Sequence, residues 1–284
     1  MVKSSLYFLS ILFLFLSCES KSPNFNAVAD LSQSEKDSLI KMKYKVFFKT
    51  HQGTPKAMTL LDEIIELDST NAEAWRERSI PYLKRGFPGQ WYKNYQKCVA
   101  YDAKEWIGWR GYNYLFFYKD FKRAIADFDA TDTLNEGFTD HPQAMSVDFL
   151  RGIAYYGLDS YDTALIYLQK YIDEEMNSSG GLAFIDQNAF LYKGRIHQKL
   201  NQHDSAFVAF NTGLQIFDQS CDLHYFKSKS FSAQGNLAMA KLEAKLAKQY
   251  FDLSYVHRRP YIEVLDQLYD YDLIELFQNL KLDY

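Results

Sequence analysis

The side chains that most often do chemistry are scattered along this 284-residue sequence instead of being gathered in a motif. It contains no glycine-rich phosphate loop, dinucleotide fingerprint, nucleophile elbow or zinc-binding His-Glu-x-x-His motif. His203, Asp204 and Ser205 have the residue types of a hydrolytic triad, but adjacent residues cannot face one another in the order a triad needs. His197 and His203 are six residues apart, on different faces of a helix, which is wrong for joint metal ligation. The sequence therefore predicts a protein with no catalysis, no metal and no cofactor.

Composition favours a folded, helical chain. Hydrophobic residues make up 47% and charged residues 24%, which excludes a disordered protein. Only 13 Gly and 6 Pro are present, a low content that argues against turn-rich β folds. The net charge of −4 does not indicate a nucleic-acid partner. The 22 Tyr and 22 Phe exceed what a plain core needs, so we expect some rings at a binding surface.

Residues 1–17 are typical of a secretory signal peptide, with Lys3 before an apolar stretch at 6–16. Eleven helical residues rise only about 16 Å, too short for a hydrocarbon core of about 30 Å. The stretch 15–18, Phe-Leu-Ser-Cys, resembles the lipobox of bacterial lipoproteins, although Phe and Leu stand where Leu and a small residue are usual. That resemblance implies acylation of Cys18, with residues 18–37 as a flexible tether. An ordinary signal peptide with a chance cysteine is the alternative.

The rest of the chain repeats itself at intervals of 33 to 42 residues. Twelve residues before each repeat marker the side chain is mostly small, and four residues after it mostly large, as facing helices require. Five residues before each marker lies a polar residue or glycine, as expected for a tight turn between two helices. These features predict stacked antiparallel helix pairs. The markers are Ala57, Trp91, Ala124, Ala164, Ala206 and Ala240.

This pattern resembles the tetratricopeptide repeat, most clearly over 119–128 and 152–164. The resemblance covers 38–254 and implies an all-α, right-handed solenoid of about six helix–turn–helix units. We expect loops at 136–144 and 177–186, and buried free thiols at Cys98 and Cys221. Residues 255–284 are predicted to form C-terminal capping helices, near 261–269 and 273–277, and the basic cluster 257–259 is interpreted as helix-end charge. The predicted units are 38–71, 72–104, 105–138, 145–178, 187–220 and 221–254.

In the tetratricopeptide family the first helix of each unit lines a concave groove, so the resemblance implies which side chains meet a partner. We expect an aromatic centre flanked by cations, because Trp, Tyr and Arg most often dominate interface energetics. Trp106 is expected to be exposed, whereas for Trp109 and Phe149 packing between repeats is an equal alternative. The residues carried over are Arg76, Trp106, Trp109, Asn113, Phe116, Phe149, Tyr156, Arg195, Tyr225 and Lys229.

Together these features predict a lipid-anchored scaffold of the bacterial cell envelope, at the outer membrane, that binds a protein or peptide in its groove. The chain is expected to bind the membrane through the lipid on Cys18. No motif identifies the protein or peptide partner. Two narrower alternatives stay open. One is an accessory lipoprotein of outer-membrane β-barrel assembly, and the other is a glycan-binding partner of a nutrient importer.

Overall fold

The computed structural model describes residues 30–178 and 180–284, where it contains thirteen α-helices and no named strand. The predicted signal peptide and Cys18 lie outside the described residues. Among the described helices, none combines the length and the apolar character needed to cross a membrane. The chain divides into two compact units: the first ends at Ser69, and the second begins at Thr70.

The N-terminal unit contributes one helix pair, α2 (Gln33–Phe47) and α3 (Pro55–Leu67). Helix α2 begins with a reciprocal cap, in which the Ser32 backbone N–H donates to the Glu35 carboxylate at 2.8 Å. The tether predicted over 18–37 is therefore wrong in its last residues, because this cap starts the helix at Gln33. In α3 the marker Ala57 is fully buried.

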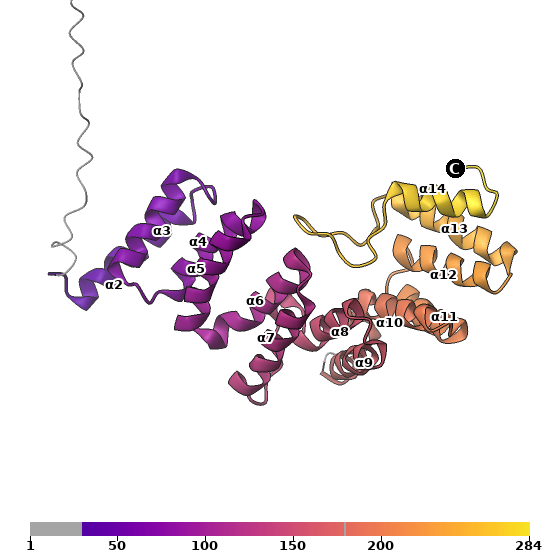
Figure 1. The fold of residues 1–284 in the computed structure, drawn as a ribbon, viewed down its shortest axis with the longest axis horizontal. Coiled ribbons are helices and arrows are strands. Elements are labelled where there is room, and N and C mark those ends of the chain that lie inside the picture. The colour runs from indigo at the N-terminus through magenta and orange to yellow at the C-terminus, as the bar shows by residue number, and fades with distance from the viewer. Residues whose placement is uncertain (1–29, 179) are drawn as a thin grey trace, which may run out of the picture. The chain divides into compact units, whose positions relative to one another are not determined.

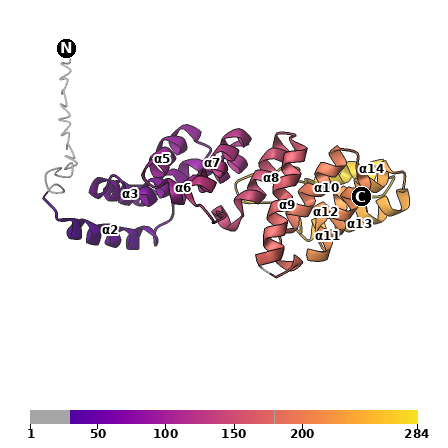
Figure 2. The same cartoon turned by 90° about the horizontal axis from the view of Figure 1, so that it is seen from below.

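The larger unit contains five further helix pairs, and the second helix of each pair packs on the first helix of the next (Figures 1 and 2). These pairs coincide with the five predicted units after the first. A last helix, α14 (Asp270–Asn279), packs on α13. The pairs are α4 (Ala72–Lys84) with α5 (Pro88–Tyr101), α6 (Ala103–Tyr118) with α7 (Phe121–Leu134), α8 (Val147–Gly157) with α9 (Tyr161–Ser178), α10 (Gln187–Lys199) with α11 (His203–Ile216), and α12 (Cys221–Ala233) with α13 (Leu237–Asp252).

Short polar side chains start most of these helices by accepting a hydrogen bond from a backbone N–H of the first turn, which would otherwise lack a partner. Between the two helices of every pair in the larger unit, one residue adopts the left-handed conformation that turns the chain sharply, at the position where the sequence predicts a turn. The capping residues are Asn71, Asp102, Asp120, Ser146, Asp186, Ser220 and Asn236. The turn residues are Gly86, Lys119, Asp159, Asn201 and Gly235, with φ between 51° and 75°.

Close contact within a pair depends on the small residues that the repeat pattern singles out. A Cβ atom added to Gly152 would lie 2.7 Å from Leu168, and one added to Gly194 would lie 2.1 Å from Phe210. Leu168 and Phe210 each lie four residues after a repeat marker, where the pattern predicts a large side chain between facing helices, and both are fully buried. The glycines thus let two helix backbones approach until a large side chain fills the gap.

The third unit makes the same contact one residue earlier than predicted. Gly111, and not Tyr112, faces Phe128, at 2.6 Å from an added Cβ. In the second unit Trp91 takes the place of alanine and is buried, with its ring centroid 4.7 Å from that of Tyr118. Aromatic packing there replaces the close alanine contact.

Two longer connections lie where insertions are predicted, and each contains a short 3₁₀ turn. These turns are Pro142–Ala144 and Leu182–Phe184. Cys98 and Cys221 are buried free thiols, as predicted, and burial raises the pKa of each thiol.

The first of the two predicted C-terminal helices is wrong. Residues 261–269 form an irregular chain in which Tyr261 and Asp266 have φ values of 67° and 56°, outside the helical region. Pro260 precedes this stretch, but a proline at this point could start a helix, so the cause lies in the contacts that Val264 and Asp266 make with other helices. The second predicted helix is present as α14, with Leu273 and Phe277 buried.

Candidate binding groove

The first helices of neighbouring repeats form one continuous row in the larger unit, because α6 contacts α8, α8 contacts α10 and α10 contacts α12. We call the surface that this row presents the inner face. Figure 1 shows that the chain between α13 and α14 does not leave this face free. It runs back across α10 and α8 toward α6. We call residues 255–269 the docked segment.

Asp266 of the docked segment pairs with Arg195, one of the cations predicted to flank the aromatic centre of the groove. Its carboxylate accepts hydrogen bonds from Arg195 Nε at 2.8 Å and Nη2 at 3.1 Å, and a short one from the Tyr156 hydroxyl. Burial alone would raise the pKa of Asp266, but these donors hold that pKa below its ordinary value. The acid is therefore ionised, and Arg195 and Tyr156 are already engaged.

Arg259 of the docked segment lies among aromatic side chains of α6. It donates to the Tyr112 hydroxyl at 3.0 Å, and its second Nη lies 2.8 Å from the sulfur of Met145. The guanidinium carbon is 5.4 Å from the centre of the Phe116 ring, within cation–π range. Phe116, expected to meet an external partner, thus meets the chain's own arginine.

Apolar and backbone contacts complete the docking. Val264 and Leu268 are 2% and 3% exposed. The Lys119 ammonium donates to the Glu263 carbonyl, and the Asp222 carboxylate accepts the His257 backbone N–H at 2.7 Å. Residues from α6 to α12 therefore hold one continuous stretch of chain.

A second cluster lies at the other end of α6, toward its first turn. The Arg76 guanidinium carbon is 5.3 Å from the ring centres of both Trp106 and Trp109, and the two indoles are 6.1 Å apart. Arg76 is also paired with Glu77. Both tryptophans are half-buried, and Trp106 is less exposed than expected because Arg76 and Trp109 pack against it. We call these three residues the Arg–Trp cluster.

The remaining predicted residues divide between core and surface. Phe149 is 1% exposed and stacks on Tyr171 at 5.0 Å, so it packs between α8 and α9 and cannot meet a partner. Asn113 and Tyr225 are also buried, at 7% and 5% exposed. Lys229 is exposed, with its ammonium 5.5 Å from the Tyr225 ring.

Sequence reasoning missed the partners that the groove already has. Arg259 belongs to the basic cluster that was interpreted as helix-end charge; that interpretation is wrong, because its guanidinium reaches α6. The signal that could have found it was a basic pair followed at once by Pro260, which ends any helix there. Asp266 carried no local signal at all.

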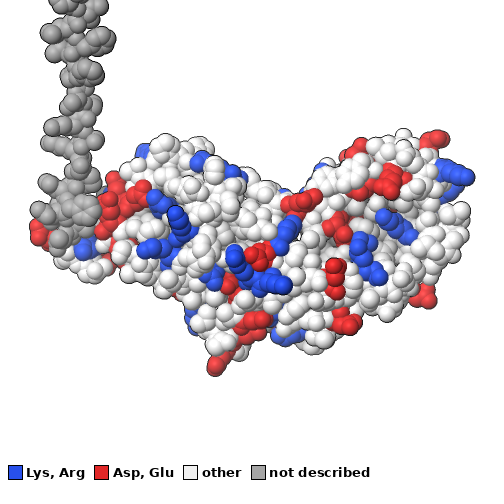
Figure 3. Space-filling view, viewed as in Figure 1, with Lys and Arg blue, Asp and Glu red and all other residues white. Residues whose placement is uncertain are grey.

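Two general observations bear on the kind of ligand. Within the described residues, no group of three or more His, Cys, Asp or Glu side chains could hold a metal ion. On the face shown in Figure 3, acidic and basic side chains are interspersed, which is not the single-sign field that attracts a phosphate backbone.

Comparison with known proteins gives a structural likeness only. No protein-family model and no curated protein matches the sequence. Among solved structures, PilW, a type IV pilus biogenesis factor, aligns with 78% of this chain and 96% of its own at 15% identity and a TM-score of 0.59. PilF of Pseudomonas aeruginosa aligns with 78% of this chain and 95% of its own, at 15% identity and a TM-score of 0.56. A tetratricopeptide repeat protein from Parabacteroides merdae aligns with 87% of this chain and 99% of its own, at 14% identity and a TM-score of 0.51. The chain has the tetratricopeptide-repeat fold. At this identity the likeness concerns the fold, and the all-α helical repeat solenoid predicted from sequence is confirmed.

Proposed function

We propose that this tetratricopeptide-repeat protein is a scaffold of the bacterial cell envelope that binds a protein or peptide and is anchored to the outer membrane by lipid on Cys18. Catalysis has no part in the proposal. A tether of this kind raises the effective concentration of the inner face for partners at the same membrane. PilW, with the same fold, is a biogenesis factor, a role of the kind that a protein-binding scaffold performs.

The observation that carries the proposal is the Arg–Trp cluster. The docked segment contacts the second half of α6, at Tyr112 and Phe116, and the residue that follows the helix, Lys119. Trp106 and Trp109 lie in the first half of α6 and keep part of their surface accessible. Trp and Arg are among the residue types that most often dominate binding energy at interfaces. Because Arg76 stands over both rings, the cluster suits a partner that packs against its edges more than a flat sugar ring.

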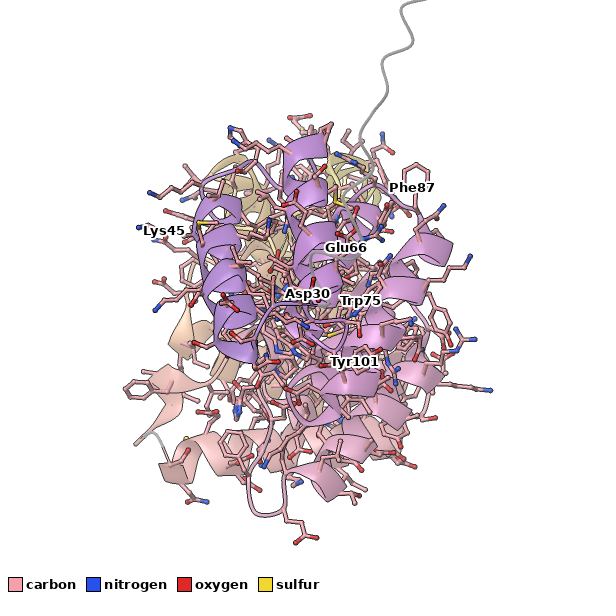
Figure 4. All side chains as sticks on the ribbon, turned by 90° about the vertical axis from the view of Figure 1, so that its left-hand side faces the viewer. Asp30, Lys45, Glu66, Trp75, Phe87 and Tyr101 are labelled. Atoms are coloured by element: carbon pink, nitrogen blue, oxygen red, sulfur yellow. The ribbon has the colours of Figure 1, made fainter. Side chains whose placement is uncertain are left out.

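The test is crosslinking followed by affinity purification of the full chain from its native envelope. Trp106→Ala should weaken capture of the partner by about 2 kcal/mol, or about thirtyfold, with helicity unchanged. Phe87→Ala is the matched control, because Phe87 is an aromatic side chain that is 50% exposed and points outward at the start of α5 (Figure 4). Equal loss with both variants, or no loss with Trp106→Ala, would contradict the assignment.

The identity of the captured protein separates the narrower alternatives. Recovery of the β-barrel assembly machine would make the chain an accessory of that complex. Recovery of a sugar importer alone would favour the glycan-binding role.

A further inference from the structure

The docked segment has the character of a bound peptide rather than of a folded element. It contains an isolated bridge between Arg259 and Ile262 and no helix, and its contacts with α6 and α10 are made mainly by side chains. Tyr261 and Asp266 adopt left-handed φ values that local preference does not favour. The conformation is therefore imposed by the surface on which the segment lies.

That surface offers two subsites of opposite charge preference. On α6, the Tyr112 hydroxyl, the Phe116 ring and, nearby, the Met145 sulfur surround a guanidinium, which is a site for arginine. On α8 and α10, the Tyr156 hydroxyl and the Arg195 guanidinium converge on a carboxylate. A fork-shaped guanidinium that binds both carboxylate oxygens fixes orientation as well as charge.

The spacing of the two subsites is set by the chain that spans them. Arg259 and Asp266 are seven residues apart, a separation that extended backbone could span over at most about 25 Å. Between them Val264 is buried against the helices, so the surface also recognises an apolar side chain two residues before the acid. Opposite charges at the two ends give the ligand one direction along the inner face.

We propose that residues 255–269 are an intramolecular ligand of the inner face, and that a partner binds there by displacing them with a segment of the same chemistry: an arginine, then seven residues later an aspartate, with an apolar residue two before it. This inference rests on the proposed function, and it adds the kind of peptide and the way in which the groove is controlled. Because the segment is joined at both ends, its effective concentration is high, and it lowers the apparent affinity of any competitor by its own occupancy.

The test uses a fluorescent synthetic peptide of residues 255–269 and the full chain in detergent micelles, with binding followed by fluorescence anisotropy. Asp266→Ala in the chain frees the cationic subsite, so the peptide should bind about tenfold or more tightly than it binds the wild-type chain. Glu263→Ala is the matched control and should change little, because it keeps the backbone carbonyl that Lys119 contacts, and the exposed carboxylate that it removes accepts its hydrogen bond from Tyr269 within the same segment. Adding Arg195→Ala to the Asp266→Ala chain, or removing the aspartate from the peptide, should abolish the gain.

Equal peptide binding to the Asp266→Ala and Glu263→Ala chains, both folded by circular dichroism, would overturn the proposal and make the segment a fixed part of the fold. If Asp266→Ala does not fold, Asp266→Asn supplies the same comparison with a side chain of unchanged shape, and binding no tighter than to the control again overturns it. The Arg–Trp cluster gives an independent readout. A chain that fails the peptide test but still loses its envelope partner on Trp106→Ala leaves the proposed function standing.

Discussion

Arg195 and Asp266 form a two-pronged ion pair, at 2.8 and 3.1 Å, across 71 residues of sequence. Arg195 was expected to present its charge to a partner, and it presents it to the chain's own C-terminal region. The pair joins the fifth repeat to the connection between α13 and α14, so we expect it to contribute to the stability of the fold as well as to control of the groove.

Removing one member of this pair leaves the other partly buried without its counter-charge. We expect Arg195→Ala to lower the free energy of unfolding by about 2 to 3 kcal/mol, measured by urea denaturation. The double variant Arg195→Ala with Asp266→Ala should lose less than the sum of the two single losses. Lys248→Ala is the control, because its pair with Asp252 lies on one helix with Asp252 56% exposed, and its loss should stay below about 1 kcal/mol. Additive losses at Arg195 and Asp266 would show that the pair is not coupled.

Close packing within the fifth repeat depends on the absence of a side chain at Gly194. Gly194→Ala places a methyl group 2.1 Å from the Phe210 ring, and we expect a loss of about 2 to 3 kcal/mol in thermal or urea unfolding. Gly89→Ala is the matched control, since nothing lies within 4 Å of its added Cβ and the residue is helical. That substitution should be neutral or stabilise by up to about 1 kcal/mol. A stable Gly194→Ala protein would mean that α10 and α11 can separate at little cost.

Two groups at the contact between the docked segment and α12, His257 and Asp222, should give opposite pH dependences. Burial and then the charge of Arg259 lower the pKa of His257 from 6.5 to about 4, so the unfolded chain binds more protons between these values. The stability from His257 is therefore present above pH 6.5 and is lost as the pH falls toward 4. Burial raises the pKa of Asp222 from 3.8 to about 6, so its contribution is present below pH 3.8 and is lost as the pH rises through 6.

These two contributions oppose each other in the wild-type chain between pH 4 and 6. In the Asp222→Asn variant only the histidine contribution of this pair remains. Its free energy of unfolding should therefore be about 3 kcal/mol lower at pH 4 than at pH 7. His257→Gln should instead gain stability, relative to its value at neutral pH, over the same range. Urea midpoints at pH 4, 5, 6 and 7 measure both, and slopes of the same sign in the two variants would contradict the assignment.

Membrane attachment is predicted to depend on one side chain near the N-terminus. If Cys18 is acylated, the Cys18→Ala protein should appear in the soluble fraction of fractionated cells, because acyl chains contribute about 0.8 kcal/mol per buried methylene. Ser20→Ala, two residues away, is the control and should stay with the membranes. Retention of Cys18→Ala in the membrane fraction would refute the anchor.

The repeats could be predicted from sequence because each one is a local object. Gly194 and Phe210 are only 16 residues apart, and the turn residue Asn201 lies between them, so one short stretch carries the information for both helices and their contact. The one-residue error in the third unit arises because a fixed count of twelve residues back from Ala124 falls on Tyr112, next to the glycine that makes the contact.

The candidate site could be predicted only where its residues belong to one element or to neighbouring repeats. Arg76, Trp106 and Trp109 come together because α4 and α6 are equivalent helices of successive units. The groove positions taken from the family pattern did not reveal that the Phe149 side chain is buried in the core. Side chains on the same face of a helix can point either toward the groove or toward the next helix, and the pattern does not distinguish the two.

What the sequence by itself determined is the helix pairs, their turns and their stacking, because caps, small residues and turn residues act over one or two helix lengths. Only the tertiary structure decided what fills the inner face. The apolar spacing of 261–269 suits a helix, yet Arg259 reaches Tyr112 across 147 residues and Asp266 reaches Arg195 across 71. Those long-range pairings, together with the burial of Val264, outweigh the weak helical preference of a short segment.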